Sequence, residues 1–353
     1  EISKTISLHP NDDVNKSQSS NDTFPTAMNM AALHLLKKRT LPGLMFLLKS
    51  LKRKASSFSK IIKIGRTHFM DATPLTLGQE FSGYVSQLEK GINNLQESCM
   101  DISELAIGGT AVGTGLNTIK GFDKMVVKKI KFFYKEMGFK STFKIASNKF
   151  EALSSNEGIV SSHHALKQLG LSINKIANDI RMSSSGPRSG IGELILPANE
   201  PGSSIMPGKV NPTQCEAITM VCSQVVGNDA AISFGAAQGH FQLNVFRPMM
   251  IYNFIISARI LGDACFSFSK NCITGIKANK VQIKRNLDNS LMLVTALNTH
   301  IGYDISAKIA KYAYENSITL KDSAKIFNIL SEDEFDKLVN PIDMIAPNKK
   351  SPN

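Results

Sequence analysis

Two serines, a lysine and an asparagine lie close together in one glycine-containing stretch, and these residue types suit an anionic substrate. The stretch reads Gly202-Ser203-Ser204-Ile205-Met206-Pro207-Gly208-Lys209-Val210-Asn211-Pro212. Asparagine is a good N-cap and proline suits the first helical position, so we expect a helix to begin at Pro212. Free N–H groups at a helix start, together with hydroxyls and an ammonium group, favour a bound carboxylate.

Two other polar clusters are each followed by a predicted helix. Ser17-Gln18-Ser19-Ser20-Asn21-Asp22 comes before a helix expected near Thr23, and Arg66-Thr67-His68 comes before one expected at Pro74. If these helix starts meet, their N–H groups and hydroxyls form a pocket for carboxylates. The alternative interpretation is ordinary helix capping, because Ser, Thr, Asn and Asp are the usual capping residues.

His68 is a poor capping residue and therefore needs another explanation. Its imidazole titrates near neutral pH, which makes it a candidate general acid or base, although a lone histidine can equally be structural. Glu216 lies in the first turn after Pro212. If the two side chains meet, its carboxylate would orient the imidazole of His68 and tune its charge.

Apolar residues at alternating steps of four and three predict the long helices that position these clusters. A period near 3.5 places such residues on one helix face and is typical of near-parallel bundles. The two clearest stripes are Phe81, Val85, Leu88, Ile92, Leu95, Cys99 and Ile102, and then Ile251, Phe254, Ala258, Leu261, Cys265 and Phe268.

These patterns predict an all-α fold with a small C-terminal helical domain. Further helices are expected over residues 158–184, from Pro212, from Thr23 to Arg39 and from Pro42, with Thr40, Pro42 and Gly43 separating the last two. We expect residues 1–22 to be the remnant of an N-terminal domain, 23–280 the long-helix bundle and 281–353 the small domain.

Composition excludes several classes of function. The 353 residues carry a formal net charge of +12, but the lysines are scattered and no nucleic-acid-binding motif occurs, so we expect no nucleic-acid partner. Five cysteines without a Cys-x-x-Cys spacing predict free thiols. No apolar run approaches the roughly 20 residues of a membrane span, so we expect no membrane partner.

Two segments carry only part of a binding motif. Residues 108–115 are glycine-rich but lack the Lys-Ser/Thr ending of a phosphate-binding loop, so we expect a turn between helices. His9-Pro10-Asn11-Asp12 combines a histidine with an aspartate, but no second ligand pair has the spacing of a metal site. We therefore expect no bound nucleotide and no metal.

Several blocks together resemble the class II fumarases of the fumarase/aspartase superfamily. They are residues 9–22, 65–68, 76–81, 108–117 and 202–212. Aspartases resemble the chain too, but they usually carry Gln where His68 stands and Thr where Ser20 stands. The resemblance therefore implies the reversible hydration of fumarate to (S)-malate, a step of the tricarboxylic acid cycle, without cofactor or metal.

The resemblance also implies catalytic roles. Ser203 would remove the proton from the methylene carbon of malate, and His68, paired with Glu216, would act on the proton of the departing hydroxyl. Lys209 and Asn211 would hold the substrate carboxylate and stabilise the aci-carboxylate. The role of Ser203 rests on the resemblance alone, because a serine hydroxyl is a weak acid whose alkoxide needs strong stabilisation.

The remaining matching residues imply contacts with dicarboxylates. Those expected at the substrate, besides Lys209 and Asn211, are Ser19, Ser20, Asn21, Thr67, Ser204 and Val210. Those expected at a second, peripheral dicarboxylate site are His9, Pro10, Asn11 and Asp12.

The resemblance further implies a homotetramer whose active sites are each built from three subunits, which fits three separate clusters in one chain. It implies a cytoplasmic location, or the mitochondrial matrix in a eukaryote. The family also has a Ser-Gly-Thr substrate-binding block upstream of Glu1, so we expect that an N-terminal segment is missing. Met70 and Gln242 replace a usual Gln and a common Glu.

Two alternatives remain open at this point. One is an aspartate ammonia-lyase of the same superfamily. The other is an inactive helical scaffold that keeps the fold, which the missing upstream block leaves possible.

Overall fold

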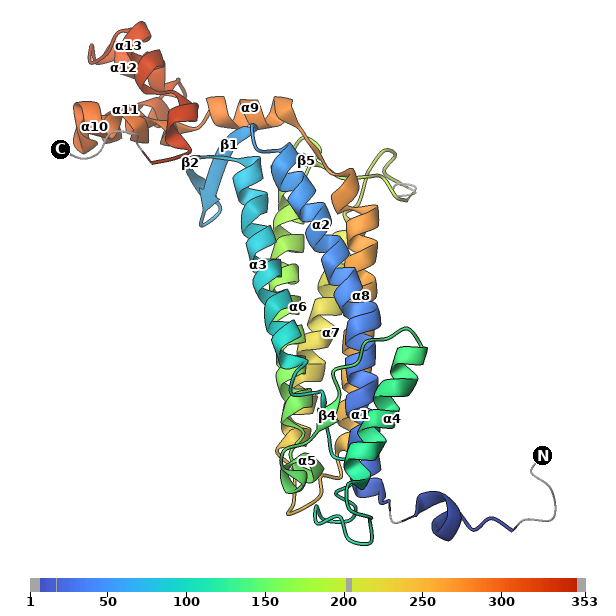
Figure 1. Cartoon of the computed structure of the whole chain (residues 1–353). Coiled ribbons are helices and arrows are strands. Elements are labelled where there is room, and N and C mark those ends of the chain that lie inside the picture. The colour runs from blue at the N-terminus through green and yellow to red at the C-terminus, as the bar shows by residue number, and fades with distance from the viewer. Residues whose placement is uncertain (1–6, 17, 201–204, 348–353) are drawn as a thin grey trace. The chain divides into compact units, whose positions relative to one another are not determined.

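The structure is a computed structural model that describes residues 7–16, 18–200 and 205–347 (Figure 1). Its contacts define two compact units. The first comprises the described residues of Glu1–Leu48, Gln87–Asn178 and Thr213–Lys270, and the second those of Lys49–Ser86, Asp179–Pro212 and Asn271–Asn353. The helices α2 (Leu41–Ser57), α3 (Leu77–Ser98) and α6 (Glu157–Ser183) contribute residues to both units. The domain boundaries expected after residues 22 and 280 remain a prediction.

The first unit is dominated by long helices. Besides its parts of α2, α3 and α6, it contains η1 (Pro10–Asn15), α1 (Ser20–Leu35), η2 (Leu36–Thr40), β3 (Glu104–Leu105), α4 (Phe122–Glu136), β4 (Lys144–Ile145), α5 (Lys149–Ser154), α7 (Thr213–Ala236) and α8 (Arg247–Asn271) up to Lys270. Side-chain bonds join neighbouring helices in the order α3, α6, α7 and α8, through Asn94–Gln168, His163–Asp229 and Asn228–Ser257.

The second unit combines short helices with small sheets. It contains β1 (Ile62–Thr67), β2 (Met70–Thr76), β5 (Leu194–Ile195), η3 (Ile273–Gly275), β6 (Lys277–Ala278), α9 (Lys280–Asp288), η4 (Leu291–Leu297), α10 (Asn298–Ile301), α11 (Tyr303–Glu315), α12 (Leu320–Ile326), α13 (Glu332–Leu338) and η5 (Pro341–Met344). Over the whole described chain, the strands form only two-stranded sheets, and β1 pairs antiparallel with β2. The predicted all-α architecture is therefore confirmed.

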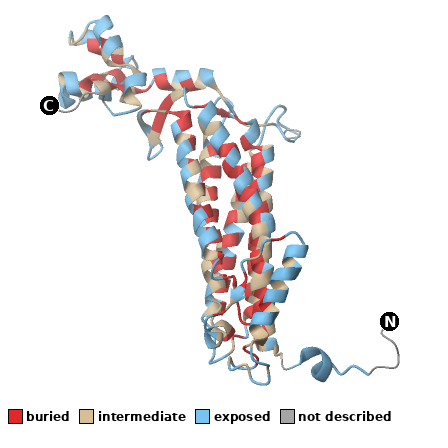
Figure 2. Cartoon of the chain, viewed as in Figure 1, coloured by how far each residue is buried: buried red, intermediate tan, exposed pale blue. Residues whose placement is uncertain are grey.

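The apolar stripes predicted from the sequence line the core, as the buried bands along the helices show (Figure 2). Phe81, Leu88 and Leu95 are each fully buried on α3, and Phe254 and Leu261 are fully buried on α8. Two members of the pattern deviate, since Val85 and Ile251 are only half-buried. All five cysteines are buried free thiols, as expected.

Helix α8 lies in a segment, Arg247–Gly275, that is long and apolar enough to cross a membrane by length and composition alone. We did not expect such a segment from the sequence. Its fully buried residues recur at helical spacing, with Met250, Phe254, Ala258 and Leu261 on one face. A helix that packs in a protein core meets the same criteria of length and composition.

The helix predicted to start at Pro74 is wrong. Pro74 lies in β2, opposite Ile64 of β1, and α3 begins three residues later. The true cap is Thr76, whose Oγ1 accepts a hydrogen bond from the N–H of Gln79 at 3.0 Å while Gln79 Oε1 accepts from the N–H of Thr76 at 2.8 Å. This reciprocal pair is a capping box, and Thr76-x-x-Gln79 was its signal in the sequence.

The other predicted helix starts need smaller corrections. Helix α1 begins at Ser20 rather than near Thr23, and α7 begins at Thr213, one residue after Pro212. The predicted break at residues 40–43 is wrong, because a π-helical segment, η2, joins α1 directly to α2. Gly43 serves helix packing instead, since a Cβ there would lie 2.1 Å from the carbonyl oxygen of Gly262 on α8.

Candidate active site

The first predicted cluster forms the start of helix α1. Ser19 is its N-cap, and the Ser19 hydroxyl accepts a hydrogen bond from the N–H of Asn21 at 3.1 Å. The fully buried Asp22 completes a capping box by accepting from the N–H of Ser19. The capping interpretation is therefore confirmed for Ser19, whereas Ser20 is exposed.

Asp22 also fixes the glycine-rich segment against the start of α1. Its Oδ2 accepts hydrogen bonds from the N–H groups of Gly108 at 2.9 Å and Thr110 at 3.0 Å. The Asn21 side chain donates to the carbonyl of Ala111 at 2.8 Å. Gly108 has a φ of 88°, so the segment is a turn that needs glycine, as expected.

The second predicted cluster lies at the tip of the β1–β2 hairpin. Thr67 pairs with Met70, which leaves His68 and Phe69 as a two-residue turn. Their φ angles are 55° and 60°, a left-handed conformation that non-glycine residues rarely adopt. Both side chains are exposed. Such backbone strain, of order 1 kcal/mol or more per residue, is typical of functional sites.

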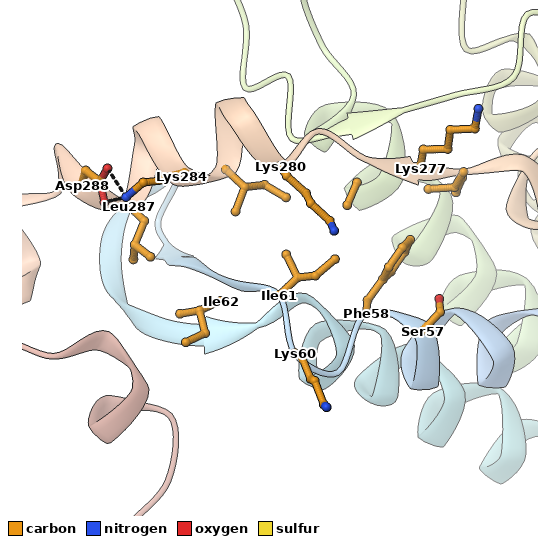
Figure 3. A pocket seen from close by; sticks show the side chains of 13 residues that line it. Ser57, Phe58, Lys60, Ile61, Ile62, Lys277, Lys280, Lys284, Leu287 and Asp288 are labelled. Atoms are coloured by element: carbon orange, nitrogen blue, oxygen red, sulfur yellow. Dashed lines mark hydrogen bonds and ion pairs between the residues drawn. The ribbon is translucent and has the colours of Figure 1, made fainter.

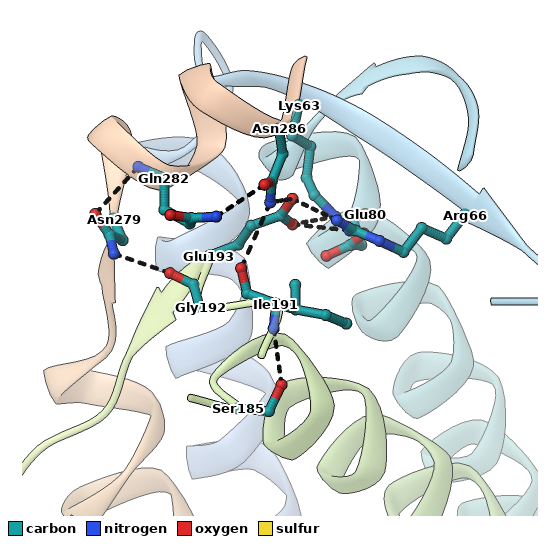
Figure 4. A network of polar contacts seen from close by, with 10 residues as sticks. All are labelled: Lys63, Arg66, Glu80, Ser185, Ile191, Gly192, Glu193, Asn279, Gln282 and Asn286. Carbon is teal, nitrogen blue, oxygen red and sulfur yellow. Dashed lines mark hydrogen bonds and ion pairs between the residues drawn. The ribbon is translucent and has the colours of Figure 1, made fainter. Parts of the chain in front are cut away.

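A buried ion-pair network secures the base of this hairpin (Figure 4). Arg66 donates two hydrogen bonds to Glu193, with Nη1 3.0 Å from Oε2 and Nη2 2.8 Å from Oε1. Lys63 Nζ lies 3.1 Å from Glu193 Oε2 and donates to Glu80 Oε2 at 2.7 Å. The sequence reasoning missed this network, because its central residue, Glu193, lies 127 positions from Arg66 along the chain.

The contact between Arg66 and Glu193 favours the charged form of both groups. Burial alone disfavours the charged form of Glu193, but the hydrogen bonds and positive charges of Arg66 and Lys63 outweigh it and lower the pKa of the carboxyl. Burial also disfavours the charged form of Arg66, but the hydrogen bonds to Glu193 and its negative charge outweigh this effect, so the pKa of Arg66 is raised. The pair of Arg66 and Glu193 therefore stays charged at neutral pH.

The third predicted cluster lines a cavity of about 430 Å³ in the second unit. Lys209, Val210 and Asn211 contribute to its wall. Residues that we did not predict complete it, and they include Arg181, Ser184, Ser185, Gly192 and Asn279. The polar run Ser184-Ser185-Gly186 directly after a long helix was an available signal. Ser203 and Ser204 lie outside the described residues.

The turn before Lys209 explains why proline and glycine stand there. The N–H of Lys209 donates to the carbonyl of Met206 at 3.3 Å, and Gly208 has a φ of 78°. Proline at the second position and a glycine with positive φ at the third are features of a type II β-turn. The turn leads Lys209 and Asn211 along the cavity wall to the start of α7.

Glu216 is exposed in the first turn of α7. It belongs to the first unit, whereas His68 belongs to the second. The predicted pairing of these two side chains therefore stays a prediction.

The predicted peripheral site lies on the π-helical turn η1. His9 caps this turn, and its Nδ1 accepts from the N–H groups of Asn11 at 3.3 Å and Asp12 at 3.2 Å. All residues of the described part of the turn are exposed. Among the described residues, no three His, Cys, Asp or Glu side chains are grouped so that they would hold a metal ion.

A second cavity of the second unit, of about 700 Å³, lies between α9 and the start of β1 (Figure 3). Its wall combines apolar residues such as Phe58, Ile61 and Ile283 with several lysines, of which Lys280 points into it. Lys284 instead pairs with Asp288 at 2.8 Å. No predicted site residue lines this cavity, so the cavity with Lys209 and Asn211 is the better candidate for the active site.

Comparison with known protein families gives two matches, and together they cover most of the chain. A family model described as "Lyase" matches residues 1–227, and one described as "Fumarase C C-terminus" matches residues 293–346. The first match includes the hairpin with His68 and the stretch with Lys209.

Individual relatives are similar over nearly all of the chain. The class II fumarate hydratase of Haemophilus influenzae is 58% identical over 96% of this chain and 72% of its own length. The mitochondrial fumarate hydratase of Macaca fascicularis is 56% identical over 98% of this chain and 67% of its own length. The crystal structure of class II fumarase from Schistosoma mansoni superposes with a TM-score of 0.93 at 42% identity, covering 98% of this chain and 74% of that one.

Proposed function

The chain belongs to the class II fumarate hydratase family, and we propose from its cavity and hairpin which residues carry out the reaction. The family consists of hydro-lyases that interconvert fumarate and (S)-malate by adding and removing water. The names of the relatives favour hydration over the ammonia-lyase alternative. Membership in an enzyme family likewise disfavours an inactive scaffold.

The observation that carries the site assignment is the cavity shared by Lys209, Asn211 and Arg181. Fumarate and malate carry two carboxylates, so their site needs positive charge and hydrogen-bond donors. An ammonium and a guanidinium group supply the charge, and the Asn211 amide supplies a neutral donor. The cavity volume falls within the usual range of small-molecule sites, about 300–1,000 Å³.

Dehydration of malate then proceeds through an aci-carboxylate. Ser203 as alkoxide takes a proton from the methylene carbon, and the electrons of that C–H bond move into the adjacent carboxylate. Lys209 and Asn211 would stabilise the extra negative charge, because an ammonium and an amide donor on the cavity wall favour an anion bound there. When the carbon–carbon double bond forms, the C–O bond breaks and the hydroxyl leaves.

His68 completes the step by giving its proton to the departing hydroxyl, which leaves as water. Glu216 would stabilise the imidazolium if the two side chains meet. The exposed, strained hairpin tip supports this role, since it holds the imidazole outside the fold of its own unit, where substrate or another subunit can reach it.

The polar residues of the other clusters would bind the substrate carboxylates. The hydroxyl of Ser20 is exposed at the start of α1, where free N–H groups favour an anion. Ser19, Asn21, Thr67, Ser204 and Val210 are proposed with it, and His9, Pro10, Asn11 and Asp12 for the peripheral dicarboxylate site. Helix α8 keeps a buried core face, so we propose no membrane partner. We also propose no nucleic-acid partner, because the lysines are scattered and no nucleic-acid-binding motif occurs.

We propose that the active sites assemble between the subunits of a homotetramer. The placement of His68 and Glu216 in different compact units is compatible with such sharing. We also propose a cytoplasmic location, or the mitochondrial matrix in a eukaryote, for which the mitochondrial relative is the support.

The variant Lys209→Met tests the site assignment. Loss of a charged hydrogen bond to the substrate should lower kcat/KM by roughly 10- to 100-fold, as followed through the ultraviolet absorbance of fumarate. Lys308→Met is the matched control, because Lys308 is an exposed lysine of α11 that does not line the cavity. Equal activity of both variants would remove Lys209 from the site.

A further inference from the structure

Glu193 is a highly connected carboxylate of the second unit. Each of its oxygens has two donors: Oε1 accepts from Arg66 and from Asn286, and Oε2 accepts from Arg66 and lies 3.1 Å from Lys63 Nζ. The Glu193 side chain is fully buried and that of Lys63 is 2% exposed. Each carboxylate oxygen therefore has both of its acceptor positions occupied, which fixes the orientation of the group.

The partners of Glu193 come from separate parts of the unit. Lys63 and Arg66 belong to β1, and Asn286 belongs to α9. The main chain of Glu193 is held too, because its N–H donates to the carbonyl of Ser183 at 2.8 Å and its carbonyl accepts from the N–H of Asn279 at 2.9 Å. Side chain and main chain together join the hairpin, the end of α6 and α9.

The residues beside this joint belong to the candidate active site. Arg66 precedes His68 by two residues on the strand that leads to the hairpin tip. On the other side, Gly192 and Leu194 flank Glu193 in sequence and line the cavity with Lys209. One carboxylate therefore fixes both the base of the His68 hairpin and the wall of the Lys209 cavity.

We propose that Glu193 is a positioning residue for the hydration reaction, which it serves through Arg66 by setting the direction of the hairpin that carries His68. The proposal rests on the proposed role of His68. The two parallel N–H···O bonds of Arg66 define a plane as well as a distance, which a lysine in the same place cannot do. Glu193 itself does not touch the substrate.

The variant Glu193→Gln keeps the shape of the side chain but turns an amide NH₂ group toward donors that need an acceptor. We expect kcat per folded protomer to fall about 100-fold, because a displacement of a reacting group by about 1 Å has an effect of this size. The change in KM should be smaller. Arg66→Lys is the second variant, because it keeps the positive charge and removes the fork. It should also lower kcat by about tenfold or more.

Asp263→Asn is the matched control. Asp263 accepts a forked pair of hydrogen bonds from Arg39 at 2.6 and 2.9 Å, but this pair is exposed and lies in the first unit. The Asp263→Asn variant should leave kcat unchanged. The folded fraction of each variant is measured by circular dichroism, and kcat is divided by it.

The outcomes separate this proposal from the proposed function. If His68→Asn abolishes activity but Glu193→Gln and Arg66→Lys keep wild-type kcat per folded protomer, only the positioning role is overturned. If Glu193→Gln does not fold, an unchanged kcat in Arg66→Lys alone overturns it. If His68→Asn keeps full activity, the assigned role of His68 fails, and the positioning role fails with it.

Discussion

His163 and Asp229 meet in the core of the first unit, where Nδ1 of the histidine lies 2.9 Å from Oδ1 of the aspartate. Both side chains are essentially buried, at 0% and 2% exposure. Lys167 donates to the other oxygen of Asp229 at 2.9 Å. The ring of His163 lies edge-to-face against Phe254, with 5.8 Å between the centroids. This polar cluster joins α6 to α7 within an otherwise apolar bundle.

Asp229→Asn should destabilise the protein by about 1–3 kcal/mol, because a buried donor loses a charged acceptor. The measurement is the free energy of unfolding in urea at neutral pH. Asp263→Asn, which removes an exposed pair, should change it by less than about 1 kcal/mol. Equal losses in the two variants would show that burial of the Asp229 cluster has no energetic consequence.

Acid should weaken the same cluster. Burial opposes ionisation of Asp229, but hydrogen bonds from His163 and Lys167 outweigh it and hold the pKa of its carboxyl below the ordinary value. A carboxyl with a lowered pKa in the folded state contributes stability above its unfolded pKa, about 4, and that contribution is lost as pH falls through the folded pKa.

The free energy of unfolding, followed in urea from pH 7 down to pH 3, should therefore fall more steeply below about pH 4 in the wild type than in Asp229→Asn. Protonation of Glu193 should also lower the free energy of unfolding as pH falls, because the pKa of its carboxyl is lowered as well. Curves for wild type and Asp229→Asn that stay parallel over this range would contradict the sign assigned to Asp229.

Gly43→Ala should destabilise the protein by about 1–3 kcal/mol through overpacking. An added Cβ would lie 2.1 Å from the carbonyl oxygen of Gly262, so α2 and α8 would have to separate. Gly83→Ala is the control, because nothing lies within 4 Å of a Cβ at this position of α3. Alanine favours helix there and should stabilise by about 0.5–1 kcal/mol. Thermal unfolding of the two variants should shift in opposite directions.

The architecture was largely predictable from local pattern. The stripe around Leu88 and the stripe around Leu261 lie in the core because a 3.5-residue period admits only one buried helix face. The error at Pro74 arose because a proline after a threonine fits a helix start and an edge strand equally well, and only the pairing with Ile64 decides between them.

The site was predictable only in part. Lys209 and Asn211 were recognised from the motif in which they stand, and they do line one cavity. Ser185 was missed although the polar run directly after α6 was an available signal. Arg181 was missed because it reaches the cavity from the end of α6, and no spacing along the chain reveals this. The same holds for Arg66 and Glu193, whose pairing spans 127 positions.

The most direct test of the account is turnover of fumarate and of aspartate by the same protein, with His68→Asn and Ser203→Ala beside it. The account predicts that the wild type forms malate from fumarate and releases no ammonia from aspartate. Each variant should lose about 10²- to 10⁴-fold in kcat, as expected for removal of a group that transfers a proton. Release of ammonia from aspartate without malate formation, or full turnover of fumarate by either variant, would contradict it.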